Sequence, residues 1–384
     1  MRPRTCAGTT RARRRRPTRA PSRPRSEKAR ASIAGPEERA LANRKPKIAW
    51  EKLSDDDLLH LRICDLGVRI RGTELELRVR QLDRELDAQR LKLKPVCFLS
   101  DEWLSPGDEA AVGIPFFLAH PRLKALENRM MFEVEGGTAS WCMRLLRHEA
   151  GHAFDHAYRL SRREDWREVF GSPRTKYQPY YYEIEPKSRD FVINVPDHYA
   201  QAHPVEDFAE TFAVWLNPAS NWRSRYEGRP AIKKLRYVDR LMRDVRGRPL
   251  PRRTPVVGPE ARTLQSTLLS YYEKKLRLFP LGDPAATERA LKRIFGASRA
   301  ARPAHPASDF IRSHKRSLVD AIAGWSGERR NQVGRVVAGL AQLCTTHNLV
   351  LRESEAKTLL KFSTFATTLI VNRLRTHSYR VTGP

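Results

Sequence analysis

The residues best suited to chemistry lie at positions 145–152, which read L-L-R-H-E-A-G-H and contain the pattern H-E-x-x-H. On a helix, residues four positions apart lie about 40° apart around the axis, so His148 and His152 would project from one face. Two imidazoles at this spacing can bind a single zinc ion. Glu149 lies beside them, where its carboxylate could take a proton from a water molecule.

A helix that presents these side chains also needs a face that packs against the protein. Such a helix is predicted from about Thr138, and its opposite face carries small and apolar residues: Leu146, Ala150, Ala153, Ala157 and Leu160. The pattern therefore predicts one buried face and one metal-binding face. The alternative is an ordinary helix that happens to carry two histidines.

A catalytic zinc site needs a third protein ligand and keeps a fourth position for water. His156 is a poor candidate because it lies a further turn along the same helix. His198 and His203 lie in the loop before the next predicted helix. Glu206 is the best candidate, because Pro204 is a typical first residue of a helix and would place Glu206 in its first turn.

Glu206 and Glu210 are four residues apart and would share one face of this second helix. One carboxylate could bind the metal while the other accepts a hydrogen bond from a ligand histidine, as is usual at zinc sites. Phe208, Phe212 and Trp215 mark the buried side. A solvated acidic helix face is the alternative interpretation.

Together the two motifs resemble those of the Glu-liganded zinc peptidases, or gluzincins. The similarity is strongest to a bacterial family of zinc-binding metallopeptidases, whose pattern R-H-E-x-G-H…Y-A-x-x-H-P-x-E-D-x-A-E-T is matched by residues 147–152 and 199–211. The catalytic domain of anthrax lethal factor is similar too, since it combines H-E-F-G-H-x-x-D with E-F-F-A-E and a tyrosine seven residues before the ligand glutamate. The resemblance covers about residues 60–220.

The resemblance implies one Zn²⁺ per chain and a role for each matching residue. These roles are zinc ligand for His148, His152 and Glu206, general base for Glu149, oxyanion or leaving-group donor for Tyr199, and support of the ligands for Glu210 and Asp155. Tyr199 could instead be a packing residue, and Asp155 could instead cap a neighbouring backbone.

The expected fold class is α+β, with a zincin-like core and a C-terminal all-helical region. A small mixed sheet would use strands at 95–99, 113–118 and 130–134, and 113–118 could be an edge that binds substrate backbone. Composition predicts four parts: a disordered basic arm at 1–47, the metallopeptidase domain at 48–246, a linker at 247–260 and a helical accessory domain at 261–384. Helical patterns in the last part cover 261–278, 286–295, 309–325, 328–347 and 353–375.

The net charge of +28 is concentrated at the two ends of the chain. Residues 1–50 hold 16 basic and 3 acidic residues, residues 251–384 hold 23 and 9, and the middle is nearly neutral. Basic ends suggest a nucleic acid or another polyanion as a partner, besides a peptide or protein substrate. Two alternatives to a plain metallopeptidase follow: a protease tethered to nucleic acid, and a non-catalytic zinc-stabilised binding module.

The five cysteines, at positions 6, 64, 97, 142 and 344, form no C-x-x-C pair. This argues against a disulfide framework and against a cysteine-ligated zinc finger. No apolar run reaches the length of a membrane span, and residues 1–30 lack the apolar segment of a secretory signal. The expected location is the cytoplasm.

Overall fold

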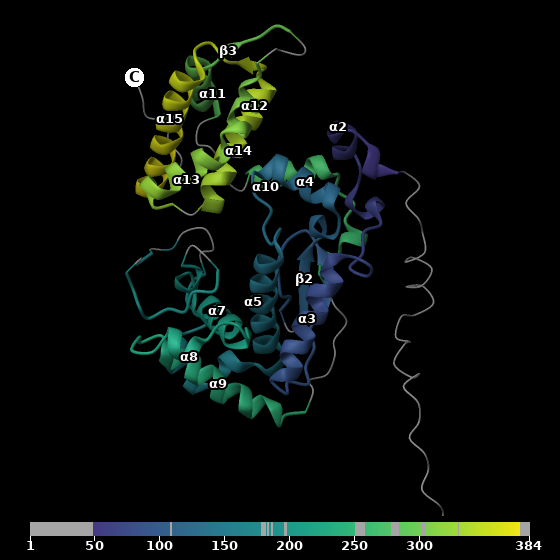
Figure 1. Ribbon diagram of the computed structural model, residues 1–384, viewed down its shortest axis with the longest axis vertical. Helices are drawn as coiled ribbons and strands as arrows, with labels where there is room; N and C mark the ends of the chain where they lie inside the picture. Colours follow the sequence, from purple (N-terminus) through teal and green to yellow (C-terminus); the bar gives the residue numbers. More distant parts are fainter. Residues whose placement is uncertain are drawn as a thin grey trace, which may run out of the picture. The chain divides into compact units, whose positions relative to one another are not determined.

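The computed structural model describes residues 49–107, 110–177, 182, 184–185, 187–195, 198–249, 258–277, 284–300, 305–328 and 330–376 (Figure 1). The predicted arm at 1–47 and most of the predicted linker lie outside these residues. Within them, no helix combines the length and the hydropathy that crossing a membrane requires.

The part of the chain that carries both motifs consists of helices and one pair of strands. In chain order these are α2 (Asp55–Leu59), α3 (Glu74–Ala88), β1 (Val96–Ser100), β2 (Ala111–Pro115), α4 (Pro121–Met131), α5 (Ala139–Tyr158), α6 (Glu164–Phe170), α7 (Pro204–Leu216), α8 (Trp222–Arg225) and α9 (Ile232–Arg246). Short 3₁₀ turns join several of them, including Phe116–Ala119 after β2 and Tyr199–Gln201 before α7.

Side-chain caps fix where three of the helices begin. Ser54 accepts a hydrogen bond from the backbone N–H of Asp57, Thr73 caps α3, and Thr138 accepts from the N–H of Trp141 at the start of α5. Each cap satisfies a backbone donor that has no partner within the helix. The helix start that the sequence predicts at Thr138 is confirmed.

The sheet near the site has two parallel strands in the described residues, β1 and β2, paired from Val96–Ala111 to Ser100–Pro115. The far side of β2 is not open at Gly113, whose N–H donates to the carbonyl of Leu104 over 2.7 Å. A Cβ at Gly113 would lie only 2.9 Å from Leu104 Cγ, which is why the position needs glycine. The predicted strand at 113–118 therefore ends at Pro115, where a 3₁₀ turn begins, and Gly113 offers no open edge because it already pairs with Leu104.

The strand predicted at 130–134 is wrong, because this stretch is the end of α4 and the turn after it. Pro121 follows the capping residue His120 and starts a helix, whose buried face Met131 completes. Phe132 then ends the helix with a left-handed φ of 64°.

One hydrophobic core holds the two motif helices together. Leu146, Ala150 and Ala153 of α5 are fully buried, as are Phe208 and Phe212 of α7. These are the faces that the sequence pattern predicted to be buried. The aromatic ring of Phe154 meets that of Phe212 at 5.3 Å between centroids, so α5 and α7 pack directly on each other.

A buried ion pair fixes α5 from its other side. The Nε and Nη2 atoms of Arg147 donate to the two carboxylate oxygens of Glu85 on α3, both over 2.7 Å, and each side chain is only 7% exposed. Such a fork-to-fork pair restricts orientation as well as distance. Because Arg147 directly precedes His148, the pair sets the rotation of α5 about its axis.

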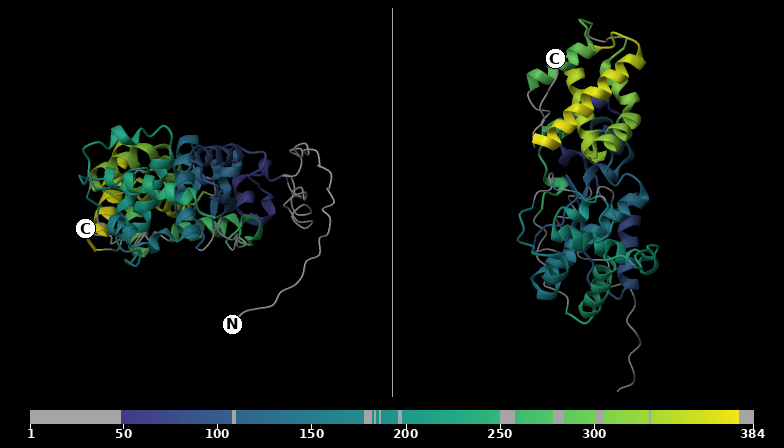
Figure 2. Two further views of the ribbon diagram at one scale, coloured as in Figure 1. Left: turned by 90° about the horizontal axis from the view of Figure 1, so that it is seen from below. Right: turned by 90° about the vertical axis from the view of Figure 1, so that its left-hand side faces the viewer.

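The C-terminal region is built from helices (Figures 1 and 2). A second core is formed by α11 (Pro284–Ile294), α12 (Ala307–Ser313), α13 (Lys315–Ser326), α14 (Arg330–Thr346) and α15 (Glu355–Thr376). The buried residues of α10 (Leu268–Arg277) belong instead to the core that holds the motif helices. One predicted helix, 309–325, is divided at His314 into α12 and α13. The α+β class with a C-terminal helical region is confirmed, and the described residues add one two-residue antiparallel pair there, Gly296–Ala297 with Leu349–Val350.

Candidate metal centre

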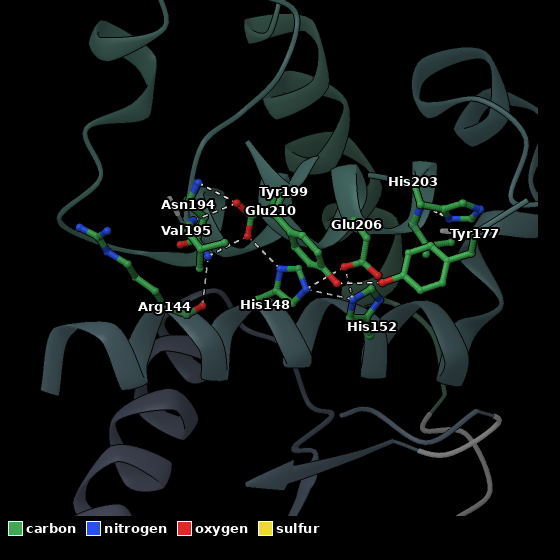
Figure 3. Close-up of polar contacts among 11 residues, drawn as sticks. Arg144, His148, His152, Tyr177, Asn194, Val195, Tyr199, His203, Glu206 and Glu210 are labelled. Carbon is green, nitrogen blue, oxygen red and sulfur yellow. Dashed lines mark hydrogen bonds and ion pairs between the residues drawn. The ribbon is translucent and has the colours of Figure 1, made fainter. Parts of the chain in front are cut away.

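Three side chains from α5 and α7 direct one ligand atom each to a common point (Figure 3). Nε2 of His148 lies 3.1 Å from Nε2 of His152, and Oε2 of Glu206 lies 3.0 and 3.2 Å from the two nitrogens. His148 and Glu206 are buried, and the side chain of His152 is 14% exposed. The helix spacing thus brings together the two histidines and the glutamate that the sequence had indicated.

The donor set fits a zinc ion. Two imidazole nitrogens and one carboxylate form one of the ligand sets of catalytic zinc sites, in which water takes the fourth position. In the described part of the chain this is the group of His, Cys, Asp and Glu side chains arranged to share one ion. The three ligand atoms lie within hydrogen-bond distance of one another, so one cation between them could bind all three.

Electrostatics favour positive charge at the same point. Burial alone would lower the pKa of His148, but its contacts with the Glu206 and Glu210 carboxylates raise that pKa well above the usual range. The pKa of His152 is raised as well, because the charge of Glu206 outweighs the effect of burial. The surroundings of the two imidazoles are therefore negative, as a cation site requires.

Glu210 holds one of the histidines in place. Its Oε1 atom accepts a hydrogen bond from Nδ1 of His148 over 2.9 Å, and the carboxylate is completely buried. This contact turns Nε2 of His148 toward His152 and Glu206, and it fixes which ring nitrogen carries the proton. The support that the sequence suggested for Glu210 has the required geometry.

The Glu210 carboxylate is held in turn by the segment before α7, which sequence reasoning did not single out. The backbone N–H groups of Asn194 and Val195 donate to Oε2 over 3.0 and 2.9 Å, and the Asn194 side chain donates to Oε1 over 3.1 Å. Asn194 also donates to the carbonyl of Arg144 on α5. Nothing in the local sequence marks Asn194, since its role depends on two helices that meet only in the fold.

Glu149 and Tyr199 lie beside the group without belonging to it. Both line the same cleft as the three candidate ligands. Burial raises the pKa of Glu149, an effect that the nearby histidines partly offset. Burial and the charge of Glu206 raise the pKa of Tyr199 well above its usual value, so its phenol keeps its proton and can donate a hydrogen bond.

Asp155 lies elsewhere. Its Oδ1 atom accepts a hydrogen bond from the backbone N–H of Ser161 over 2.7 Å, just past the left-handed residue Arg159 that ends α5. The sequence suggested that Asp155 either supports the ligands or caps a neighbouring backbone, and this contact has the geometry of a backbone cap. It fixes the turn that leads out of α5.

The remaining candidate histidines are not among the three converging donors. His203 caps α7, because Nδ1 accepts from the N–H of Val205, while Nε2 donates to the carbonyl of Thr175 over 2.8 Å. His198 has a left-handed φ of 53° and precedes the turn that carries Tyr199. The ring of His156 stacks beside that of His152 at 6.3 Å.

A cleft of about 930 Å³ opens onto the site. Its walls include Trp103 from the segment beside β2, Trp141 from α5, Lys274 from α10 and Arg335 from α14. The cleft is therefore bounded by elements from both halves of the described chain. A space of this size accommodates several residues of an extended peptide.

Gly151 allows α5 and α7 to approach closely. A Cβ at this position would lie 3.1 Å from Cα of Ala209 and 3.2 Å from Cβ of Phe212. We expect Gly151→Val to lower the free energy of unfolding by about 2–3 kcal/mol, because extra methyl groups in a packed contact force the elements apart. Urea denaturation would measure this, and zinc affinity should fall with it because Glu206 moves away from the histidines.

Gly324 provides a matched control within α13. It is exposed, and a Cβ there would meet no atom within 4 Å. Gly324→Val should change the free energy of unfolding by less than about 0.5 kcal/mol, as is usual for surface substitutions. Equal stability of the two variants would show that the contact between α5 and α7 is not the reason for glycine at 151.

A buried His-His-Glu group on two packed helices, with a further glutamate beside it and a cleft in front of it, is an arrangement found in zinc-binding metallopeptidases. Comparison with known families agrees: residues 143–226 match the model of the family described as "Putative zinc-binding metallo-peptidase". The match confirms, for this segment, the family resemblance indicated by the two motifs. No curated protein and no solved structure matches the chain, and the similarity to the lethal factor domain stays a prediction.

Proposed function

We propose that the protein is a zinc-dependent metallopeptidase that hydrolyses peptide bonds, with one Zn²⁺ per chain held by His148, His152 and Glu206. The observation that carries the proposal is the convergence of these three ligand atoms within 3.0–3.2 Å of one another at the base of a cleft. A bound zinc ion supplies Lewis acidity, which acidifies water and polarises a carbonyl oxygen.

Glu149 carries the protons in this proposal. Its carboxylate takes one proton from the attacking water as the new C–O bond forms at the peptide carbonyl. It then passes that proton to the leaving amine as the C–N bond breaks, so the reaction consumes one water and returns the enzyme unchanged. The burial that raises the pKa of Glu149 makes it a stronger base than an exposed carboxylate.

Tyr199 is placed to stabilise the charge that develops on the carbonyl oxygen. Its ring lies 5.7 Å from that of His148, on the cleft side of the candidate ligands. A protonated phenol in a buried position is a preorganised donor, and loss of one such donor typically costs about 3–4 kcal/mol of transition-state stabilisation.

A purely structural zinc site is the competing function from the sequence, and two features argue against it. Structural sites are closed by four protein ligands, whereas three donors converge here and the site faces a cleft of about 930 Å³. A structural site also has no use for a buried glutamate beside the ligands, since that group is costly to bury.

Removing and restoring the metal tests the proposal. Elemental analysis of the purified full chain should find one zinc per chain, and a fluorogenic peptide library should reveal hydrolysis. We expect 1,10-phenanthroline to abolish hydrolysis and stoichiometric zinc to restore it, while magnesium should not, since two imidazoles are poor ligands for that ion. Zinc without any hydrolysis would support the structural alternative, and hydrolysis that survives complete metal removal would contradict the proposal.

A further inference from the structure

A second tyrosine, Tyr177, lies in the cleft with its hydroxyl on Tyr199. The two Oη atoms are 2.8 Å apart, so one phenol donates a hydrogen bond to the other (Figure 3). Each phenol has a single proton. Only one of the two protons is used between the rings. The Tyr177 hydroxyl also contacts the Glu206 carboxylate, which can accept its proton.

The position of Tyr177 is fixed by the helix that carries Glu206. His203, the capping residue of α7, donates from Nε2 to the carbonyl of Thr175, two residues before Tyr177. The Tyr177 ring stands edge-on against the His203 ring, with 5.2 Å between centroids. His203 is buried, so it ties the loop after α6 firmly to the start of α7.

Tyr177 itself is not a core residue. Its side chain is 42% exposed, and it lines the cleft together with Glu149 and Glu206. A tyrosine kept only for packing would bury its ring and pair its hydroxyl with a backbone group, as Tyr226 does when it accepts a hydrogen bond from the N–H of Ile193. The hydroxyl of Tyr177 meets instead the residue that faces the substrate.

We propose that Tyr177 is a positioning residue for Tyr199: its hydroxyl, which lies between Oη of Tyr199 and the Glu206 carboxylate, holds the Tyr199 phenol in place for the carbonyl oxygen of the bound peptide. Hydrogen bonds in such a chain polarise one another, so loss of the Tyr177 hydroxyl weakens the contact that Tyr199 makes. The inference rests on the proposed function and adds to it a second tyrosine that acts through the first.

A double-mutant cycle with Tyr177→Phe and Tyr199→Phe tests this coupling. We expect Tyr177→Phe to lower kcat about 5–10-fold with KM unchanged, since one hydrogen bond is lost from the transition state. In the Tyr199→Phe background the same change should have no further effect. Unchanged kcat in the single variant, or equal losses in both backgrounds, would overturn the proposal.

The same double-mutant cycle can be measured by inhibitor binding, which requires no turnover. An N-phosphoryl-Leu-Trp dipeptide carries phosphoryl oxygens that imitate the charged tetrahedral intermediate, and its affinity can be measured by calorimetry on the zinc-loaded chain. Tyr177→Phe should weaken it about 5–10-fold, again only while Tyr199 is present. Zinc-loaded wild type that binds this probe but cleaves no peptide would end the proposed function while the cycle still tests the tyrosine pair.

Tyr158→Phe provides a matched control. Tyr158 is the last residue of α5, its ring contacts Phe154 in the core, and it is not a lining residue of the cleft. Loss of the Tyr158 hydroxyl should leave kcat and probe affinity within about twofold of wild type. An effect as large as that of Tyr177→Phe would show that the loss of any phenol hydroxyl disturbs the fold, and the positioning role would fall.

Discussion

Glu149→Gln is expected to keep zinc at the wild-type stoichiometry and to lower kcat by about 10³-fold, the range that a lost general base usually costs. The amide has almost the shape of the carboxylate but cannot accept a proton from water at neutral pH. Glu149 is not one of the three converging ligand atoms, so its replacement leaves the donor set intact. Elemental analysis and steady-state kinetics on the same preparation measure both parts of the expectation.

Glu168→Gln is a suitable control for this experiment. Glu168 lies exposed on α6, and it is absent from the residues that line the cleft. Its kinetic constants should match those of the wild type. If Glu149→Gln retains full activity, another group must accept the proton, and the mechanism proposed for Glu149 is wrong.

The parts of the structure that were predictable from sequence are those set by local rules. The 3.6-residue period places His148 and His152 on one face and Leu146 and Ala150 on the other, whatever the rest of the chain does. Capping is equally local, so Thr138 marks the start of α5 correctly. The same local reading failed at 130–134, because a short apolar run fits either a strand or the last turn of a helix.

The parts that were not predictable depend on contacts between distant segments. Nothing near Glu85 shows that it meets Arg147, 62 residues away, and nothing near Asn194 shows that it supports Glu210. Tyr177 could be seen only as one aromatic residue in a long loop. Its meeting with Tyr199 requires the fold of that loop, which His203 fixes from α7.

The basic C-terminal region contributes Lys274 and Arg335 to the walls of the cleft, whereas the N-terminal arm raises a different question. The arm at 1–47 lies outside the described residues, and binding of nucleic acid or another polyanion stays a prediction. The proposed chemistry does not depend on that arm, because the three candidate ligands, Glu149 and the cleft all lie within the described residues. A tether would change which substrates reach the cleft and not how they are cleaved.

Glu206→Ala is expected to lose most of its zinc and, with it, all hydrolysis. The change removes the one carboxylate among the three ligands and leaves two neutral imidazoles, so the site loses both a ligand atom and the negative charge that offsets a cation. Glu210→Gln should be milder. It keeps a group that can accept the hydrogen bond from His148, and loss of such support typically weakens zinc binding by about 10- to 100-fold.

The relative zinc affinities of these two variants distinguish a metal ligand from a residue that orients a ligand. Competition with a zinc-chelating dye measures affinity on the folded chain, and circular dichroism confirms that each variant is folded. A larger loss for Glu206→Ala than for Glu210→Gln means that Glu206 binds the metal and Glu210 orients His148. The reverse order would exchange the two roles. Wild-type affinity in Glu206→Ala would move the third ligand to another residue, with His203 and His156 as imidazoles to test, and the His-His-Glu assignment would be abandoned.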